Sequence, residues 1–328
     1  LTRSDTGFVN LMGMAGSYAH NRAETLESSG VHFGSDEGAD YFTSLIWEQL
    51  ERELAGKADH ALPGSTDSLS SIDMSESDAS VWILPGSWMA GVEIDGTNVS
   101  LHGWDRDLVT LLSESDGNAV HVRPGASCDI SRLSIQGGSG IQGADGIRRG
   151  GAVLADSSMV SIIECHLQEG SADLGGLLAQ INAETTMIDT RLKIGLAIDG
   201  GLIHVNGGSL TAADCFLSGG IAMKGGGVLV QDGVVIINDS HLFDSEALLN
   251  GGAAAVFGGE LTWNDVEVDG CVSESGGALT VVAGETVLLG CNVHGNTAET
   301  GGGLVNEGGD LSVATSQFCS NPNGNIIG

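Results

Sequence analysis

Charged side chains recur at one position of a repeating pattern in the second half of this 328-residue chain. The recurring carboxylates are Glu164, Asp189, Asp214, Asp239 and Asp265. Two residues after the first four come His166, Arg191, Phe216 and His241, and Lys193 lies two residues beyond Arg191. If successive repeats stack, these groups lie side by side. Two kinds of chemistry are then open to them, acid–base catalysis and cation binding.

Acid–base catalysis on a polysaccharide is the first interpretation. A glycosidase needs two carboxylates roughly 5–9 Å apart, and a lyase needs a base beside a cation. The residues that would serve are Asp189, Asp214, Arg191, Lys193 and His166. Aromatic residues make up only 4% of the chain, with two Tyr, so a sugar-stacking groove is poorly supplied. We therefore expect no catalytic residue, and keep a polysaccharide lyase or glycoside hydrolase as the alternative.

Cation binding is the second interpretation. Carboxylates stacked in successive repeats repel one another by about 1 kcal/mol per pair even in bulk water, so something should offset that repulsion. Each Asp could cap its own turn by accepting backbone N–H groups. Alternatively, Ca²⁺ could be shared between repeats, because hard cations prefer clustered oxygen ligands. The calcium ligands would be Glu164, Asp189, Asp214, Asp239 and Asp265.

A repeat of roughly 25 residues, a period typical of solenoid proteins, positions these side chains. Gly-Gly pairs begin at Gly150, Gly175, Gly200, Gly225, Gly251, Gly276 and Gly301, so the interval is constant except for one additional residue between Gly225 and Gly251. Within each repeat apolar and polar residues alternate, which is typical of strands. One apolar column consists of Ile162, Met187, Ala212, Ile237, Trp263, Leu288 and Val313. Each repeat therefore holds three short strands joined by tight turns.

A three-strand repeat of this length favours one fold. It is too short for a propeller blade, and it has no room for the helix of a leucine-rich repeat. It suits one coil of a parallel β-helix, whose coils stack at roughly 4.8 Å. We expect an all-β solenoid of about ten coils over residues 78–328, with an enlarged, projecting turn at 136–149, where five Gly occur.

The segment 1–77 lacks the repeat. Residues 43–55 predict a helix, because Ile46, Leu50 and Leu54 form one apolar face. We expect residues 1–62 to be an N-terminal segment in which this helix either caps the first coil or docks a partner, since a solenoid must cover its open end. Residues 63–77 are rich in Ser and Asp and predict a linker.

Composition limits the partners. Acidic residues number 43 and basic residues 12, so the formal net charge is -31. Such a chain repels phosphate backbones, and we expect no nucleic acid partner. No apolar run reaches the ~18 residues of a transmembrane helix, so we expect no transmembrane segment. The six Cys show no zinc spacing, and we expect them to serve in packing.

Short motifs within the repeat resemble a known family. Gly150-Gly-Ala-Val153, Gly276-Gly-Ala-Leu279 and Phe318-Cys-Ser-Asn321 are similar to the GGA[ILV] and FxxN motifs of polymorphic outer-membrane protein repeats. The resemblance covers about residues 150–321. It implies a right-handed β-helix with an extracellular or cell-surface location, and in that family the β-helix takes part in adhesion or envelope architecture.

The sequence thus predicts a non-enzymatic extracellular or cell-surface β-helix that serves as a structural or adhesive element. Assembly is part of this prediction, because the ends and flat faces of a solenoid are natural contacts. We expect a homo-oligomer or a larger surface assembly, with a polysaccharide as a further possible partner. We expect no cofactor, except that Ca²⁺ could bind at the acidic column.

Overall fold

The computed structural model describes residues 60–62, 69, 74–75, 77–83, 85–113 and 116–328. They belong to one compact unit, Asp59–Gly328. It is an all-β parallel solenoid of about ten coils, which confirms the predicted fold class. No α-helix occurs among the described residues. The predicted N-terminal helix at 43–55, and all but a few residues of the predicted linker at 63–77, lie outside them.

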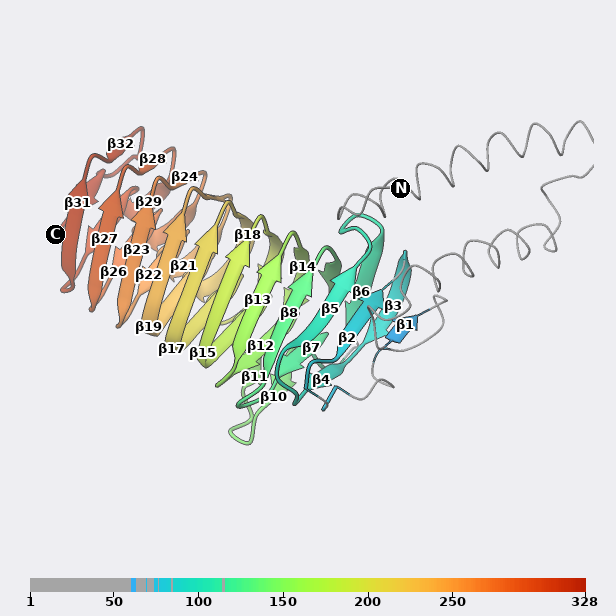
Figure 1. Cartoon of the computed structure of the whole chain (residues 1–328). Coiled ribbons are helices and arrows are strands. Elements are labelled where there is room, and N and C mark those ends of the chain that lie inside the picture. Colours follow the sequence, from blue (N-terminus) through green and yellow to red (C-terminus); the bar gives the residue numbers. More distant parts are fainter. Residues whose placement is uncertain (1–59, 63–68, 70–73, 76, 84, 114–115) are drawn as a thin grey trace, which may run out of the picture. The chain divides into compact units, whose positions relative to one another are not determined.

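Three columns of parallel strands build the coils (Figure 1). Face 1 contains β4 (Val92–Ile94), β7 (Val120–Val122), β12 (Val153–Asp156), β22 (Ala254–Val256), β26 (Leu279–Val281), β30 (Leu304–Asn306) and β33 (Ile326–Ile327). Face 2 contains β1 (His60–Leu62), β2 (Ser80–Ile83), β5 (Val99–Gly103), β8 (Ser127–Ser131), β13 (Met159–Ile163), β23 (Glu260–Asn264), β27 (Glu285–Leu289) and β31 (Asp310–Ala314). Strands β15 (Leu178–Ile188), β17 (Ile203–Ala213) and β19 (Val228–Asn238) run through both faces.

Face 3 carries His166, Arg191 and Lys193 and begins just after the acidic column. Its strands are β3 (Gly86–Ala90), β6 (Val109–Ser113), β9 (Ser134–Gln136), β14 (His166–Ser171), β16 (Arg191–Leu196), β18 (Phe216–Lys224), β20 (His241–Phe243), β24 (Glu267–Asp269), β28 (Asn292–His294) and β32 (Gln317–Cys319). After a bend, the ends of β14, β16 and β18 continue as an extension of face 3. In later coils this extension is formed by β21 (Glu246–Asn250), β25 (Val272–Ser275) and β29 (Thr297–Thr300).

The apolar columns predicted from the repeat form the core. Ile162, Met187, Ala212, Ile237, Trp263 and Leu288 are all fully buried. They occupy one register position of face 2, so each stacks on its counterpart in the next coil. Val313 holds the same position in the last coil but is 37% exposed. The repeat therefore predicts the inward positions correctly, and burial falls where no further described coil covers them.

The Gly-Gly pairs form a ladder that fixes how closely the coils stack. The first Gly of each pair has a positive φ, for example 68° at Gly200 and 65° at Gly276. The second Gly leaves no space for a side chain: a Cβ on Gly201 would lie 2.1 Å from the carbonyl oxygen of Gly226, and one on Gly277 would lie 2.3 Å from that of Gly302. Glycine is thus required at both positions for conformation and for space.

The glycine turns also explain why face 1 is buried on both sides at its middle position from β12 to β30. Its middle position, held in successive coils by Leu154, Ala179, His204, Leu229, Ala255, Thr280 and Val305, is at most 6% exposed. A Cβ on Gly276 would lie 2.4 Å from Thr280 Oγ1, and one on Gly301 would lie 2.4 Å from Val305 Cγ2. The turn of each coil therefore packs on the side chain that follows it.

Two segments depart from the regular stack. The expected projection at 136–149 contains an antiparallel hairpin of β10 (Ile141–Gln142) and β11 (Arg148–Arg149), which extends from the stack in Figure 1. An ion pair of 2.5 Å between Arg149 Nη2 and Asp145 Oδ2 closes it. At the other end β1 pairs in parallel with β2, ahead of residue 78 where we expect the β-helix to begin.

Candidate functional site

The acidic column predicted from the repeat lies at the corner between faces 2 and 3. Its members are Glu164, Asp189, Asp214, Asp239 and Asp265, with φ of 53°, 45°, 54°, 47° and 52°. Asp tolerates this left-handed conformation better than most residues, and Gly290 takes the same position one coil later with a φ of 66°. The carboxylates point to solvent, since all five residues are exposed or, for Asp189, 47% exposed at the side chain.

Neighbouring cations offset part of the column's charge. Arg106 Nη1 lies 3.2 Å from Asp189 Oδ1 and also donates to the Asp189 carbonyl at 2.9 Å. Arg132 Nε lies 3.9 Å from Glu164 Oε2. Within the described part of the chain, the column's side chains accept no backbone hydrogen bond, so positive φ rather than turn capping accounts for the Asp residues. Sequence reasoning missed Arg106, which lies 83 residues before Asp189.

The calcium hypothesis stays a prediction. No group of three or more His, Cys, Asp or Glu among the described residues is arranged to hold a metal ion. The column would have to recruit carboxylates from successive coils together with solvent oxygens, which Ca²⁺ accepts readily.

The predicted catalytic residues do lie on neighbouring coils. His166 pairs with Arg191 across β14 and β16, and Gln168 pairs with Lys193. Arg191 lies over the ring of Phe216 at 5.7 Å. Asp189 and Asp214 occupy the corner beside them in successive coils. The structure thus groups the five residues along one edge of face 3, as the repeat predicts.

The environment of His166 limits what this group can do. Burial, aided by Arg106, lowers the pKa of His166, while Asp107 opposes that shift. Its Nδ1 lies 3.7 Å from Asp107 Oδ1, and its Nε2 is buried without a hydrogen-bond partner among the described residues. A neutral imidazole beside two guanidinium groups suits a general base, but the nitrogen that is not turned to Asp107 is closed to solvent in this arrangement.

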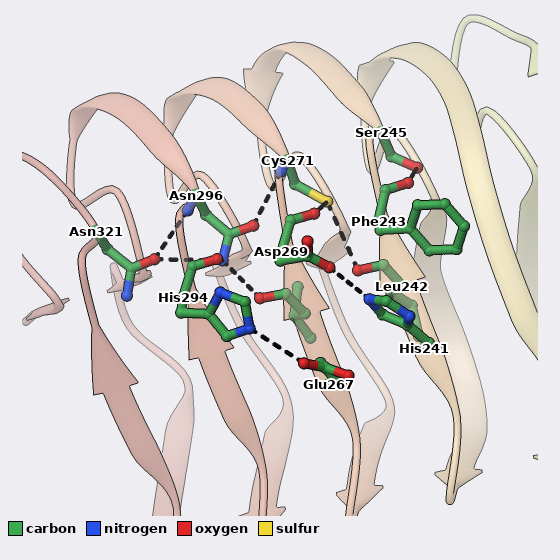
Figure 2. A network of polar contacts seen from close by, with 11 residues as sticks. His241, Leu242, Phe243, Ser245, Glu267, Asp269, Cys271, His294, Asn296 and Asn321 are labelled. Carbon is green, nitrogen blue, oxygen red and sulfur yellow. Dashed lines mark hydrogen bonds and ion pairs between the residues drawn. The ribbon is translucent and has the colours of Figure 1, made fainter.

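A second cluster of titratable groups lies further along face 3, and the sequence analysis did not identify it as a unit. Figure 2 shows His241 bonded through Nε2 to Asp269, and His294 bonded through Nε2 to Glu267 at 3.1 Å. The strand register makes both contacts diagonal, because His241 pairs with Glu267 and Asp269 pairs with His294. In the sequence, this contact is signalled by an acidic residue that lies one repeat length plus two residues before or after a His.

Beneath this cluster, a ladder of side-chain amides links the coils from inside (Figure 2). Asn321 Oδ1 accepts the N–H of Asn296 at 3.0 Å, and Asn296 Oδ1 accepts the N–H of Cys271 at 2.9 Å. Asn296 Nδ2 donates to the carbonyls of Val268 and His294. Asn296 is fully buried, so these bonds satisfy backbone groups that water does not reach.

The cysteines behave as packing residues. All six are free thiols, and five are buried. Burial raises the pKa of Cys165 and of Cys271 to about 12 and that of Cys215 to about 11. Since the thiolate is the reactive form, these groups are inert at neutral pH.

One buried histidine on face 1 is chemically distinct from its neighbours. His204 is 4% exposed and lies between Ala179 and Leu229 in the stack. Burial lowers its pKa to about 4, with a smaller contribution from Arg149. His204 is therefore neutral at physiological pH, and its titration is coupled to folding rather than to a solvent-facing site.

Among the residues that the structure describes, no helix is both long and apolar enough to cross a bilayer. The fold is that of a parallel β-solenoid, and its surface chemistry lies along face 3. Comparison of the chain with protein-family models, with curated proteins and with solved structures finds no match.

Proposed function

We propose that the chain is a non-enzymatic structural or adhesive β-helix of the cell surface or extracellular space, and a subunit of a larger assembly. The observation that carries the proposal is how its titratable groups are paired. On face 3 and at its edge they contact one another between coils: His241–Asp269 and His294–Glu267 join successive coils, and Arg106–Asp189 joins coils that lie further apart. Paired in this way, they do not converge on one reacting atom.

The regularity of the solenoid supports the same conclusion. Inward columns and the glycine ladder repeat from coil to coil, as a structural element built of stacked units requires. The right-handed winding and the surface location belong to the proposal as well. They rest on the resemblance of the Gly150–Val153, Gly276–Leu279 and Phe318–Asn321 motifs to polymorphic outer-membrane protein repeats.

Sedimentation velocity of the full chain, with and without ~10 mM Ca²⁺, a level set by weak extracellular sites, tests the proposal. We expect species larger than the monomer, and further growth with Ca²⁺ if the acidic column binds it. Substituting Asp214→Asn and Asp239→Asn together should then remove the Ca²⁺ response and leave the Ca²⁺-independent species unchanged.

A polysaccharide lyase or hydrolase is the second candidate, because a neutral His166 beside Arg106 and Arg191 places a base next to cations. Such an enzyme must produce new reducing ends or the absorbance of an unsaturated sugar from an extracellular polysaccharide. Cleavage by the full chain that is lost in Asp189→Ala would establish the enzyme and overturn the structural proposal.

A further inference from the structure

Six large apolar side chains are exposed together on three neighbouring coils, where face 3 bends into its extension. We call them the apolar patch: Ile194, Leu196, Ile198, Ile221, Met223 and Leu248, which are 55, 55, 53, 48, 38 and 60% exposed. The backbone holds them side by side. Leu196 pairs with Ile221, the N–H of Met223 bonds to the carbonyl of Ile198, and Leu248 follows Ala247, the partner of Ala222.

The size of the patch sets it apart from ordinary surface. At about half exposure the six side chains present roughly 500 Å² of apolar area, near the upper end of what a monomeric protein exposes. Within each coil the residues between them, Ala197, Ala222 and Ala247, point inward and are at least partly buried. The patch is thus one side of a regular sheet surface whose other side belongs to the core.

Ile194 supplies independent evidence that the patch is a contact surface. It has a φ of 59°, a left-handed conformation that is strongly unfavourable for a β-branched residue. The same left-handed position is held in other coils by Gly219, Gly270 and Gly295 and by the polar residues Glu169 and Asp244, with φ of 60° and 50°. Ile194 therefore carries both backbone strain and exposed apolar surface where glycine would carry neither. Contact with another molecule would offset both costs.

The charges around the patch are arranged unevenly. The part of the chain from residue 59 onward contains eight basic residues, and three of them border the patch: Arg191 and Lys193 on β16, and Lys224 on β18, which lies 4.0 Å from Asp199. On the opposite side, toward later coils, lie Glu246 of β21 and Glu274 of β25. The patch therefore has a basic border at its first coil and an acidic border at its last.

We propose that a second copy of this chain docks on the apolar patch, face to face and with the two solenoid axes antiparallel. A two-fold axis through the patch lays the β16 side of one copy over the β21 side of the other. Lys193 then approaches Glu246 of the second copy, and each contact occurs twice, as an isologous interface requires. A parallel arrangement would instead bring like charges together. This inference rests on the proposed role as an assembly subunit and identifies its first contact.

The area available is sufficient for a specific dimer. Two patches face to face remove roughly 1,000 Å² of apolar surface from water, which is the lower bound for a specific interface before any contribution from the polar rim. An interface at this lower bound is typical of weak or transient association, and its area does not fix its affinity. Sedimentation equilibrium of the full chain in Ca²⁺-free buffer, over as wide a concentration series as the chain tolerates, locates the dissociation constant.

The first variant places a charge at the centre of the patch. Met223→Glu sets two carboxylates against each other across the two-fold axis, and we expect dimerisation to weaken at least ~100-fold. Met159→Glu is the matched control, because Met159 is 56% exposed on β13 of face 2, and it should leave the dissociation constant essentially unchanged. Equal effects of the two variants, or a monomer throughout the concentration range, would overturn the proposal.

The second variant separates a contact role from a structural one. Ile194→Gly removes backbone strain, so the unfolding midpoint of the monomer should rise or stay unchanged, while dimerisation should weaken about 5- to 20-fold. A loss of stability without any change in dimerisation would contradict the assignment of Ile194 to the contact.

A charge exchange tests the antiparallel orientation. Lys193→Glu and Glu246→Lys should each weaken the dimer about 10-fold, and the double variant should recover to within about 3-fold of the parent. Failure of the double variant to recover would overturn the orientation.

These outcomes are distinct from failure of the proposed function itself. A chain that is monomeric without Ca²⁺, forms larger species with Ca²⁺ and cleaves no polysaccharide overturns only the dimer. A chain that cleaves polysaccharide and loses that activity in Asp189→Ala overturns the structural role, and a dimer insensitive to Met223→Glu leaves assembly in place but removes this contact. Binding of neutral phosphatidylcholine vesicles that is lost in Met223→Glu, with no dimer, would assign the patch to lipid and not to a second copy.

Discussion

The middle coils and the later coils of face 3 share one backbone plan but present different surfaces. In the middle, β16, β18 and β21 carry the apolar patch beside Arg191 and Lys193. Further along, β20, β24 and β28 carry the paired His and carboxylate groups. The strands stay in parallel register throughout. The outward positions therefore vary independently of the stack that supports them.

The residues at the bend within face 3 also differ between the two regions. In the middle coils Gly195 and Gly220 stand at the bend, and a Cβ on either would lie 2.2 Å or less from a carbonyl oxygen of the glycine ladder. In the later coils Asn296 and Asn321 take this position and bond across the coils. The bends with glycine use close backbone packing, and the bends with asparagine use side-chain amides, to achieve the same stacking.

The largest effect should come from the glycine ladder, which both regions share. Gly201→Val in the middle and Gly277→Val in the later coils would each place side-chain atoms within contact of a backbone carbonyl. We expect each to lower the free energy of unfolding by on the order of 4 kcal/mol or more, measured by denaturant titration. Gly117→Ala, with nothing within 4 Å of its Cβ, should be nearly neutral. If the two valine variants lose very different amounts of unfolding free energy, the glycine ladder does not support the two regions equally.

A pH titration should distinguish the buried middle position of face 1 in the two regions, where His204 corresponds to Thr280. The pKa of His204 falls from 6.5 in the unfolded chain to about 4 in the folded one. Its neutral form is thus favoured by folding, so the stability that it contributes is full above pH 6.5 and is lost as the pH falls toward 4. The loss is about 3 kcal/mol.

Leucine, which already occupies this column at Leu229, provides the control for that titration. His204→Leu should flatten the difference in unfolding midpoint between neutral and mildly acidic pH, while the other titrating groups remain the same in both proteins. An unchanged pH dependence in His204→Leu would assign the acid sensitivity to the surface carboxylates.

The amide ladder is specific to the later coils, and its loss should cost less. Asn296→Ala leaves the N–H of Cys271 and the carbonyl of Val268 without their side-chain partner, which is expected to cost about 2–3 kcal/mol. Asn296→Ser should cost less, because Ser245 bonds to the N–H of Gly220 at the corresponding position two coils earlier. If both variants unfold at the same denaturant concentration as the parent, the later bend does not depend on its amides.

The smallest effect should come from the outward ion pairs. Glu267 and His294 are 48% and 32% exposed at the side chain, so a double-mutant cycle of Glu267→Gln and His294→Gln should give a coupling of about 0–1 kcal/mol. Thermal unfolding at low ionic strength is suited to detecting it. A coupling of several kcal/mol would mean that the surface of the later coils helps to hold the stack, contrary to the independence of outward positions.

The repeat predicts the core but not the apolar patch, for a physical reason. Alternation with period two identifies Ile162 and Met187 as one column, and the columns stack as expected. The patch residues Leu196 and Ile198 alternate in the same way, and alternation alone does not tell which side of a strand faces inward. The positive φ at Ile194 changes the direction of the chain just before them. The signal for that conformation lies in the neighbouring repeat, where Gly219 holds the same position, and not in the residues next to Ile194.

The partners of the candidate site were harder to predict than its members. The acidic column follows from the repeat, and its positions are those of the corner between faces 2 and 3. Arg106 belongs to the earlier coils, where the period is irregular, so its contact with Asp189 had no sequence signal. Asn296 and Asn321, by contrast, are separated by one repeat length, and a search for buried amides at that spacing could have found the ladder.

The glycine ladder also sets the step by which this molecule can change its length. Duplicating or deleting one whole repeat keeps each Gly-Gly pair stacked on the pair of the next coil. An insertion of any other length moves the pairs of neighbouring coils out of register. The single longer interval, between Gly225 and Gly251, shows where one additional residue is accommodated. It lies in β21, between Ala247 and Asn250, where the pairing with β18 slips by one, outside the buried columns. Each duplicated repeat would thus lengthen the solenoid by one coil, or roughly 4.8 Å.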